Sequence, residues 1–181
     1  VKGVFDKAKE KGALIITETD IKLKESEKLL CTLSSTTFAR GDGGFGGPSD
    51  GAPAPHSIPE RKSDDEFFAD TEPNQALIYR LAGDRNPLHS DPEIAKAAGF
   101  DVPILHGLCT YGTACRTIIS NVCNYDSKLI EEFNVRFSSP VYPGEKISTE
   151  IWSDDNVISF RCWVRDRNVM VLNNGKCVLK G

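Results

Sequence analysis

A single long helix that is apolar on most of its surface most constrains how this chain of 181 residues can fold. Between residues 107 and 123, large apolar side chains recur at helical spacing, and most of the side chains between them are also apolar or small. Those at helical spacing are Leu108, Tyr111, Cys115, Ile118, Ile119 and Val122. A helix of this kind has to be buried on much of its surface. The rest of the chain must therefore cover it.

Strand patterns dominate the chain after this helix. We expect strands at 132–138, 146–152, 157–164, 169–172 and 176–179, with turns at 143–144, 154–156, 166–168 and 173–175. Strands and helices do not alternate, which argues against a parallel doubly wound sheet. We therefore predict an α+β fold in which an antiparallel meander wraps the long helix and buries it.

The first third of the chain has a different pattern. Residues 13–21 are β-branched and bounded by charge, and 29–39 fit the returning strand of a hairpin. Residues 41–62 form a glycine- and proline-rich stretch, which indicates a linker or a surface loop. A phosphate-binding loop is the weaker interpretation, because no strand–loop–helix context surrounds these glycines.

Two shorter helices are expected before the long one. Residues 73–81 have a helical pattern. Asp91-Pro92-Glu93 is typical of a helix start, with an N-cap residue, a proline at the first helical position and an acid in the first turn. Gly99 fits the end of that short helix.

Composition argues against several classes of function. The net charge is −4 and the basic residues are scattered, so we expect no nucleic-acid partner. No apolar run approaches the ~20 residues that span a bilayer, so we expect no membrane insertion. The six cysteines form no C-x-x-C pair and have no metal-ligand spacing to a histidine. We expect structural cysteines in a reducing compartment, and no metal.

The polar cluster Asp84, Asn86 and His89 is the first candidate site. Gly83 and Pro87 hold this segment away from regular helix, so three polar side chains can point to one place. An Asp–His pair can hold and activate a water molecule, which a carboxamide can orient. The alternative is that Asp84 and Asn86 only form a turn and that His89 caps it. Spacing alone leaves both interpretations open.

His106-Gly107 adds a second candidate component. Gly107 begins the long helix, where backbone N–H groups lack intrahelical partners and the helix dipole favours negative charge. An unobstructed N–H at this position suits an enolate or oxyanion. The alternative is that the glycine only permits close packing. A water-activating pair together with an oxyanion donor is what the addition of water to a conjugated thioester requires.

Two segments of the chain resemble a known sequence motif. Residues 79–92 (YRLAGDRNPLHSDP) and 98–110 (AGFDVPILHGLCT) closely resemble the motif of the R-specific 2-enoyl-CoA hydratases, or hydratase 2, which includes MaoC-like proteins and the hydratase region of peroxisomal multifunctional enzyme type 2. Residues 40–47 are similar to the linker of that family, and Arg136-Phe137 and 140–144 to a later strand and turn.

The resemblance implies a hot-dog fold, a sheet wrapped around one long helix. It further implies the second repeat of a double hot dog whose first repeat is truncated: residues 1–40 as its remnant, 41–66 as the linker loop and 67–181 as the hydratase repeat. The implied reaction is the reversible hydration of trans-2-enoyl-CoA to (3R)-3-hydroxyacyl-CoA in fatty acid β-oxidation. The chain begins at Val1, so we expect a piece of a longer protein.

The resemblance also assigns roles to residues. Asp84 and His89 would hold and activate water, Asn86 would orient it, and the Gly107 N–H would stabilise the oxyanion. The substrate-binding set it suggests is Lys11, Asp84, Arg85, Asn86, Pro87, Leu88, His89, His106, Gly107 and Phe137, with Lys11 near the CoA moiety. No cofactor is expected; an acyl-CoA thioester is the expected partner.

Assembly and location are expected from the family alone. Hot-dog architecture predicts a homodimer. The family predicts a peroxisomal location, although Gly181 does not end a Ser-Lys-Leu-like tripeptide. Two alternative functions stay open: a non-catalytic acyl-CoA-binding fragment of the same fold, and a hot-dog thioesterase.

Overall fold

The computed structural model describes residues 1–181 as two compact units, Val1–Ala54 and Pro55–Gly181. The first unit is a three-stranded antiparallel sheet in the order β1-β2-β3, formed by β1 (Gly3–Asp6), β2 (Ala13–Lys22) and β3 (Leu29–Ala39). The predicted hairpin of β2 and β3 is confirmed. The short strand β1, which covers four residues, was not predicted from the sequence.

The carboxylate of Asp6 organises the glycine-rich loop of the first unit. It accepts hydrogen bonds from the N–H groups of Gly44 and Gly46, both at 2.8 Å, and these bonds help to lower the pKa of Asp6. A Cβ atom on Gly43 would lie 2.1 Å from the carbonyl oxygen of Ala8. The stretch is irregular, as predicted, but its glycines are needed for close packing and not only for flexibility.

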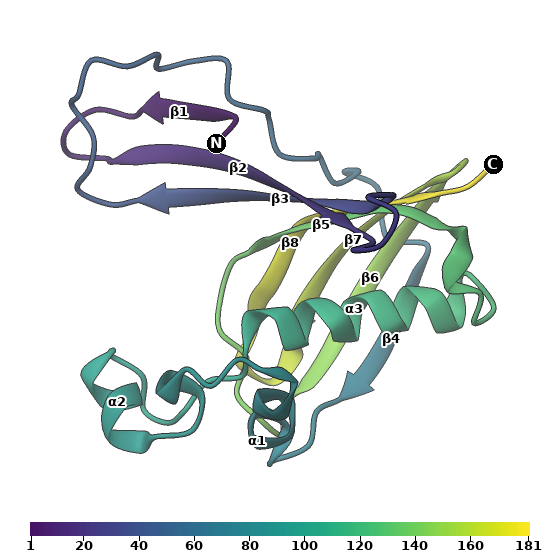
Figure 1. The fold of residues 1–181 in the computed structure, drawn as a ribbon. Helices are drawn as coiled ribbons and strands as arrows, with labels where there is room; N and C mark the ends of the chain where they lie inside the picture. Colours follow the sequence, from purple (N-terminus) through teal and green to yellow (C-terminus); the bar gives the residue numbers. More distant parts are fainter. The chain divides into compact units, whose positions relative to one another are not determined.

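The second unit is an α+β fold, as predicted. Its five-stranded antiparallel sheet has the order β4-β6-β7-β8-β5, and α3 lies across one face of it (Figure 1). The elements are β4 (Asp65–Asp70), α1 (Gln75–Tyr79), α2 (Pro92–Ala97), α3 (Gly107–Asn121), β5 (Ile130–Phe137), β6 (Lys146–Asp154), β7 (Val157–Val164) and β8 (Val169–Leu179), with 3₁₀ turns at Arg80–Ala82, Pro87–His89, Ser127–Leu129 and Arg165–Arg167. Ile118, Phe160 and Leu172 are fully buried in the core between α3 and the sheet.

Two details of the sheet differ from the prediction. β5 pairs with β8 and not with β6, so the strands after α3 are not a simple meander. The expected turn at 173–175 is wrong, because β8 runs without a break from Val169 to Leu179. β7 pairs Phe160 with Gly175 and Cys162 with Leu172, so two residues of β8 face one of β7. The turn-forming residues therefore make a bulge.

The short helices follow the predicted signals. α1 and the 3₁₀ turn after it occupy the helical pattern at 73–81. Asp91 caps α2 by accepting a hydrogen bond from the Glu93 N–H at 2.9 Å. β4 was not predicted, and it begins inside the range expected to be loop. No helix of the structure has both the length and the apolar character to cross a membrane.

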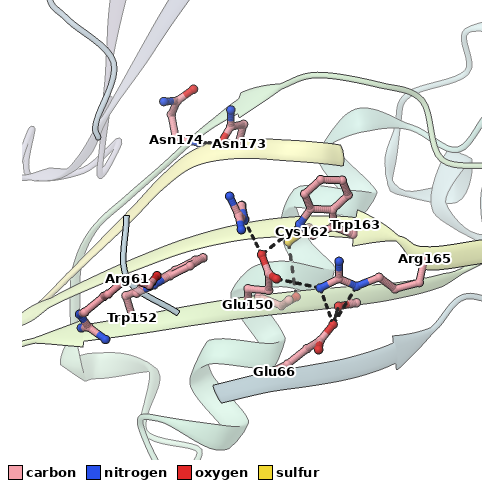
Figure 2. A network of polar contacts seen from close by, with 12 residues as sticks. Arg61, Glu66, Glu150, Trp152, Cys162, Trp163, Arg165, Asn173 and Asn174 are labelled. Carbon is pink, nitrogen blue, oxygen red and sulfur yellow. Dashed lines mark hydrogen bonds and ion pairs between the residues drawn. The ribbon is translucent and has the colours of Figure 1, made fainter. Parts of the chain in front are cut away.

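The face of the sheet opposite the buried core carries a polar network around Glu150 (Figure 2). The Glu150 carboxylate accepts hydrogen bonds from Trp163 Nε1 at 3.0 Å, Arg165 Nη2 at 2.8 Å and Arg161. Residues 55–64 also contact this face, where Trp152 Nε1 donates to the Arg61 carbonyl at 2.8 Å. The central strands β6 and β7 are therefore largely buried, whereas the outer strands β4 and β5 are mostly exposed.

The bulge at Gly175 makes a test of the sheet possible. A Cβ atom there would lie 2.4 Å from the carbonyl oxygen of Phe160 and 2.7 Å from its ring. We expect Gly175→Ala to lower the free energy of unfolding by about 1–3 kcal/mol, because the buried strands must move apart. Urea denaturation measures the change.

Gly112 in α3 is the matched control. Nothing lies within 4 Å of a Cβ atom at that position, so Gly112→Ala should raise the free energy of unfolding by about 0.5–1 kcal/mol. Equal effects of the two substitutions would show that the bulge does not need glycine.

Candidate active site

The segment that carries Asp84 and Asn86 is an exposed turn between two 3₁₀ helices. Gly83 has φ 121°, a conformation that favours glycine. Asp84 Oδ1 accepts from the Asn86 N–H at 3.2 Å, and Asn86 Oδ1 accepts from the Leu88 N–H at 3.1 Å. These bonds use one oxygen of each side chain. The turn-forming interpretation is confirmed, and the second carboxylate oxygen of Asp84 and the NH₂ group of Asn86 have no partner in the structure, so they remain available.

His89 presents one ring nitrogen to the site. Its Nδ1 lies 2.8 Å from the carbonyl oxygen of Ile104. Because a carbonyl oxygen only accepts, Nδ1 carries the proton and Nε2 of the neutral ring is an acceptor. The backbone of Ile104 therefore fixes the tautomer in which His89 can take a proton from water.

Asp84, His89 and His106 lie together at this point. A carboxylate oxygen of Asp84 and one ring nitrogen of each histidine all lie within 4.8 Å of one another. One water molecule can contact both a carboxylate oxygen and a ring nitrogen across such a separation. The rings of His89 and His106 are stacked, with centroids 3.8 Å apart and planes at 28°.

His106 lies beneath the site and not at its surface. Its ring is only 1% exposed, and Nε2 donates to the backbone carbonyl of Asp84 at 3.1 Å. Tyr79 packs on the same ring with centroids 4.7 Å apart. Burial lowers the pKa of His106, so the ring is neutral at pH 7. Nδ1 is buried and has no hydrogen-bond partner.

The start of α3 offers free backbone donors. The His106 side chain does not cap the helix, and its carbonyl accepts from the N–H groups of Cys109 and Thr110. The N–H groups of Gly107 and Leu108 have no acceptor in the structure. A Cβ atom on Gly107 would lie 3.2 Å from the Phe137 ring. The absence of a side chain thus leaves room for that ring and keeps the N–H accessible.

Two pockets, called hollows below, border Gly107 and His89. One of about 310 Å³ has Gly107 and Phe137 in its wall, with Phe100, Ile104, Thr110 and Val171. The other, of about 260 Å³, has His89 in its wall, with Leu77 and Val102. Both walls are mostly apolar. An apolar chain could therefore lie next to the free N–H of Gly107.

The remaining predicted substrate-binding residues are placed as follows. Arg85 and Pro87 are exposed beside Asp84, and Leu88 is partly buried. Lys11 lies in the first unit, exposed in the turn between β1 and β2. Sequence reasoning did not find Tyr79 or the carbonyl of Ile104 as parts of the site. A backbone carbonyl leaves no signal in the sequence, because every residue has one.

The chain is similar to known proteins along nearly its whole length. A family model described as MaoC like domain matches residues 55–173. An enoyl-CoA hydratase of Mycobacterium tuberculosis is 43% identical over 177 residues, covering 97% of this chain and 60% of that protein. A peroxisomal enoyl-CoA hydratase 2 of Arabidopsis thaliana is 42% identical over 179 residues, covering 94% and 57%.

A solved structure gives the same result. The crystal structure of a MaoC-like dehydratase from Phytophthora capsici has a TM-score of 0.90 and 39% identity to this chain, covering 98% of it and 61% of that chain. The chain thus spans about 60% of the length of each of these three relatives.

The buried neutral state of His106 predicts how stability depends on pH. Its pKa is lower in the folded chain than the ordinary value of 6.5, so the unfolded chain binds the proton more readily. The free energy of unfolding should therefore fall as the pH drops below about 6.5. In His106→Gln, which cannot titrate, the fall between pH 7 and 5.5 should be smaller. Urea denaturation across this range measures both slopes, and parallel curves would contradict the assignment.

Proposed function

The chain belongs to the MaoC-like domain family, and we propose that it catalyses the reversible addition of water to a trans-2-enoyl-CoA to give a (3R)-3-hydroxyacyl-CoA. One observation carries the proposal. A carboxylate oxygen of Asp84 lies within 4.8 Å of a ring nitrogen of His89, and the start of α3 offers an N–H of Gly107 without an acceptor. The relatives named enoyl-CoA hydratase support the same reaction.

In the proposed hydration, Asp84 and His89 Nε2 hold the water, and the NH₂ group of Asn86 orients it. The water oxygen bonds to C3 while its proton passes to one of these two acceptors. The electron pair of the C2=C3 bond moves toward the thioester, whose oxygen becomes negative. The acceptor that took the proton from water then gives a proton to C2, and the thioester carbonyl is restored. Dehydration is the same sequence in reverse.

Gly107 is the proposed donor to the thioester oxygen. Its N–H lies at the N-terminal end of a helix of 15 residues, where the dipole favours negative charge. Loss of one oxyanion donor typically costs about 10²–10³-fold in turnover. The helix that holds the core together would thus also supply this stabilisation.

The substrate contacts are proposed from the family and from exposure. Arg85, Pro87, Leu88 and Phe137 would line the CoA thioester site, and Lys11 would lie near the CoA moiety. Phe137 supports this role, since it is 51% exposed and borders the hollow next to Gly107. An apolar acyl chain would occupy that hollow.

We also propose the double-hot-dog organisation, with residues 1–40 as the rest of a first repeat, 41–66 as the linker and 67–181 as the hydratase repeat. The uncovered strand β3 supports it, because Leu29, Leu30 and Leu33 are all more than half exposed. Large apolar side chains exposed in this number on one strand need a covering element. A homodimer is proposed from the architecture, and sedimentation of the pure chain tests it.

A peroxisomal location is proposed for a eukaryotic source. It rests on relatives such as the one named peroxisomal in Arabidopsis thaliana. A bacterial relative in Mycobacterium tuberculosis has the same domain, so the fold alone does not determine the compartment.

Conservative substitutions should separate chemistry from folding in this site. Asp84→Asn keeps an oxygen for the Asn86 N–H but removes the charge. His89→Asn keeps a donor for the Ile104 carbonyl but removes the Nε2 acceptor. We expect each to lower turnover by about 10²–10⁴-fold with little change in stability, because each removes a proton acceptor. Loss of enoyl-CoA absorbance measures turnover, and near-normal rates in both would disprove the mechanism.

The control and the alternative functions use the same assay. The control is His56→Gln. His56 lies on the Glu150 side of the sheet, where its Nε2 is hydrogen-bonded to Ser159 Oγ at 2.8 Å, so the variant should hydrate substrate at the wild-type rate. Binding without any loss of enoyl absorbance would favour an acyl-CoA-binding fragment. Release of free CoA thiol would favour a thioesterase.

A further inference from the structure

We propose that His106 is a positioning residue, which holds the water-activating segment in place from below through the backbone of Asp84 and the ring of His89. This inference rests on the proposed hydratase function. It differs from the expectation that His106 binds substrate, because the ring is only 1% exposed. A side chain so deeply buried has almost no surface with which to contact a ligand.

The hydrogen bond to Asp84 is the first support. Among residues 83–88, the bonds of Gly83, Asp84 and Asn86 otherwise run to neighbours within three positions along the chain. His106 Nε2, which lies 22 residues away, donates to the Asp84 carbonyl at 3.1 Å. It is the one hydrogen bond that ties this exposed turn to the buried part of the unit. The direction in which the Asp84 carboxylate points therefore depends on His106.

The stacked rings are the second support. His106 lies against His89 with centroids 3.8 Å apart and against Tyr79 with centroids 4.7 Å apart. His89 is also held by the Ile104 carbonyl, which comes from the chain just before His106. The ring of His106 thus contacts one water-activating residue directly and the other through its backbone.

The charge state of His106 suits this task. The groups that act on it are His89, Asp84 and Arg80, and burial is the largest cause of its lowered pKa. Tyr79 and Cys109 are near, and burial raises the pKa of each, so both are neutral at pH 7. When His89 takes the proton of water, it then faces a neutral ring and not a second cation, which would repel it.

Because Nδ1 of His106 has no partner, a substitution of this residue changes only one side-chain hydrogen bond. Since no donor meets this buried atom, replacing the ring nitrogen removes no hydrogen bond there. The bond to the Asp84 carbonyl is the only one that His106→Phe loses, and the variant keeps a buried aromatic ring. His106→Gln loses the aromatic ring but keeps the hydrogen bond, because the amide NH₂ of glutamine can reach the Asp84 carbonyl.

Hydration kinetics give the first measurement. We expect His106→Phe to lower kcat about tenfold or more, with KM within about twofold of the wild type, because one hydrogen bond that fixes geometry is gone. His106→Gln should recover most of that loss. A rise in KM with unchanged kcat would overturn the proposal in favour of substrate contact, and wild-type kinetics in His106→Phe would overturn it outright.

Amide hydrogen exchange gives a second measurement that needs no activity. The N–H groups of Asn86 and Leu88, both bonded within the turn, should exchange about tenfold faster in His106→Phe and near the wild-type rate in His106→Gln. Amides of β7 should not change in either variant. Unchanged exchange at Asn86 and Leu88 would overturn the proposal. If the wild-type chain shows no hydration, only the proposed function fails, and the exchange data still decide the role of His106.

Discussion

The burial of α3 against the sheet is the interaction on which the rest of the second unit depends. Ala114 and Ile118 of α3 are fully buried, and Phe160 and Leu172 of the sheet close the core around them. Burying side chains of this size stabilises a fold by about 1.5–3 kcal/mol each. Because the middle of the helix cannot move, its first residues have a fixed place. The packing of Ala114 and Ile118 in the core therefore fixes the position of the free N–H of Gly107.

The sequence predicts α3 and most strands of the sheet correctly. The apolar pattern of α3 and the strand patterns of β6 and β7 are strong because burial on the core face leaves little choice of residue. The bulge in β8 could not be predicted, since Asn173-Asn174-Gly175 has the same composition as a hairpin turn. Only the packing of Gly175 on Phe160 distinguishes the two. The partner of β5 is likewise a matter of topology and not of local pattern.

The site could be predicted in part. The motif marks unusual residue types at fixed spacing, and the structure brings two of them, Asp84 and His89, next to His106, the residue before Gly107. What connects them could not be predicted. The bonds from His89 and His106 run to backbone carbonyls, which any residue provides. The burial of His106 next to the exposed Gly107 is also invisible in a sequence where both lie in one motif.

Asp84, Asn86 and His89 each use one side-chain atom for a structural hydrogen bond and leave another without a partner. Asp84 and Asn86 each commit one oxygen to the turn, and His89 commits Nδ1 to a carbonyl. The fold thereby fixes the direction of the atom that remains, and the buried ring of His106 supports both Asp84 and His89 from below. A substitution that removes the proposed acceptor atom therefore usually removes a structural hydrogen bond as well. Asn in place of Asp84 or His89 is informative for this reason, since it can keep the structural bond and remove only the reactive atom.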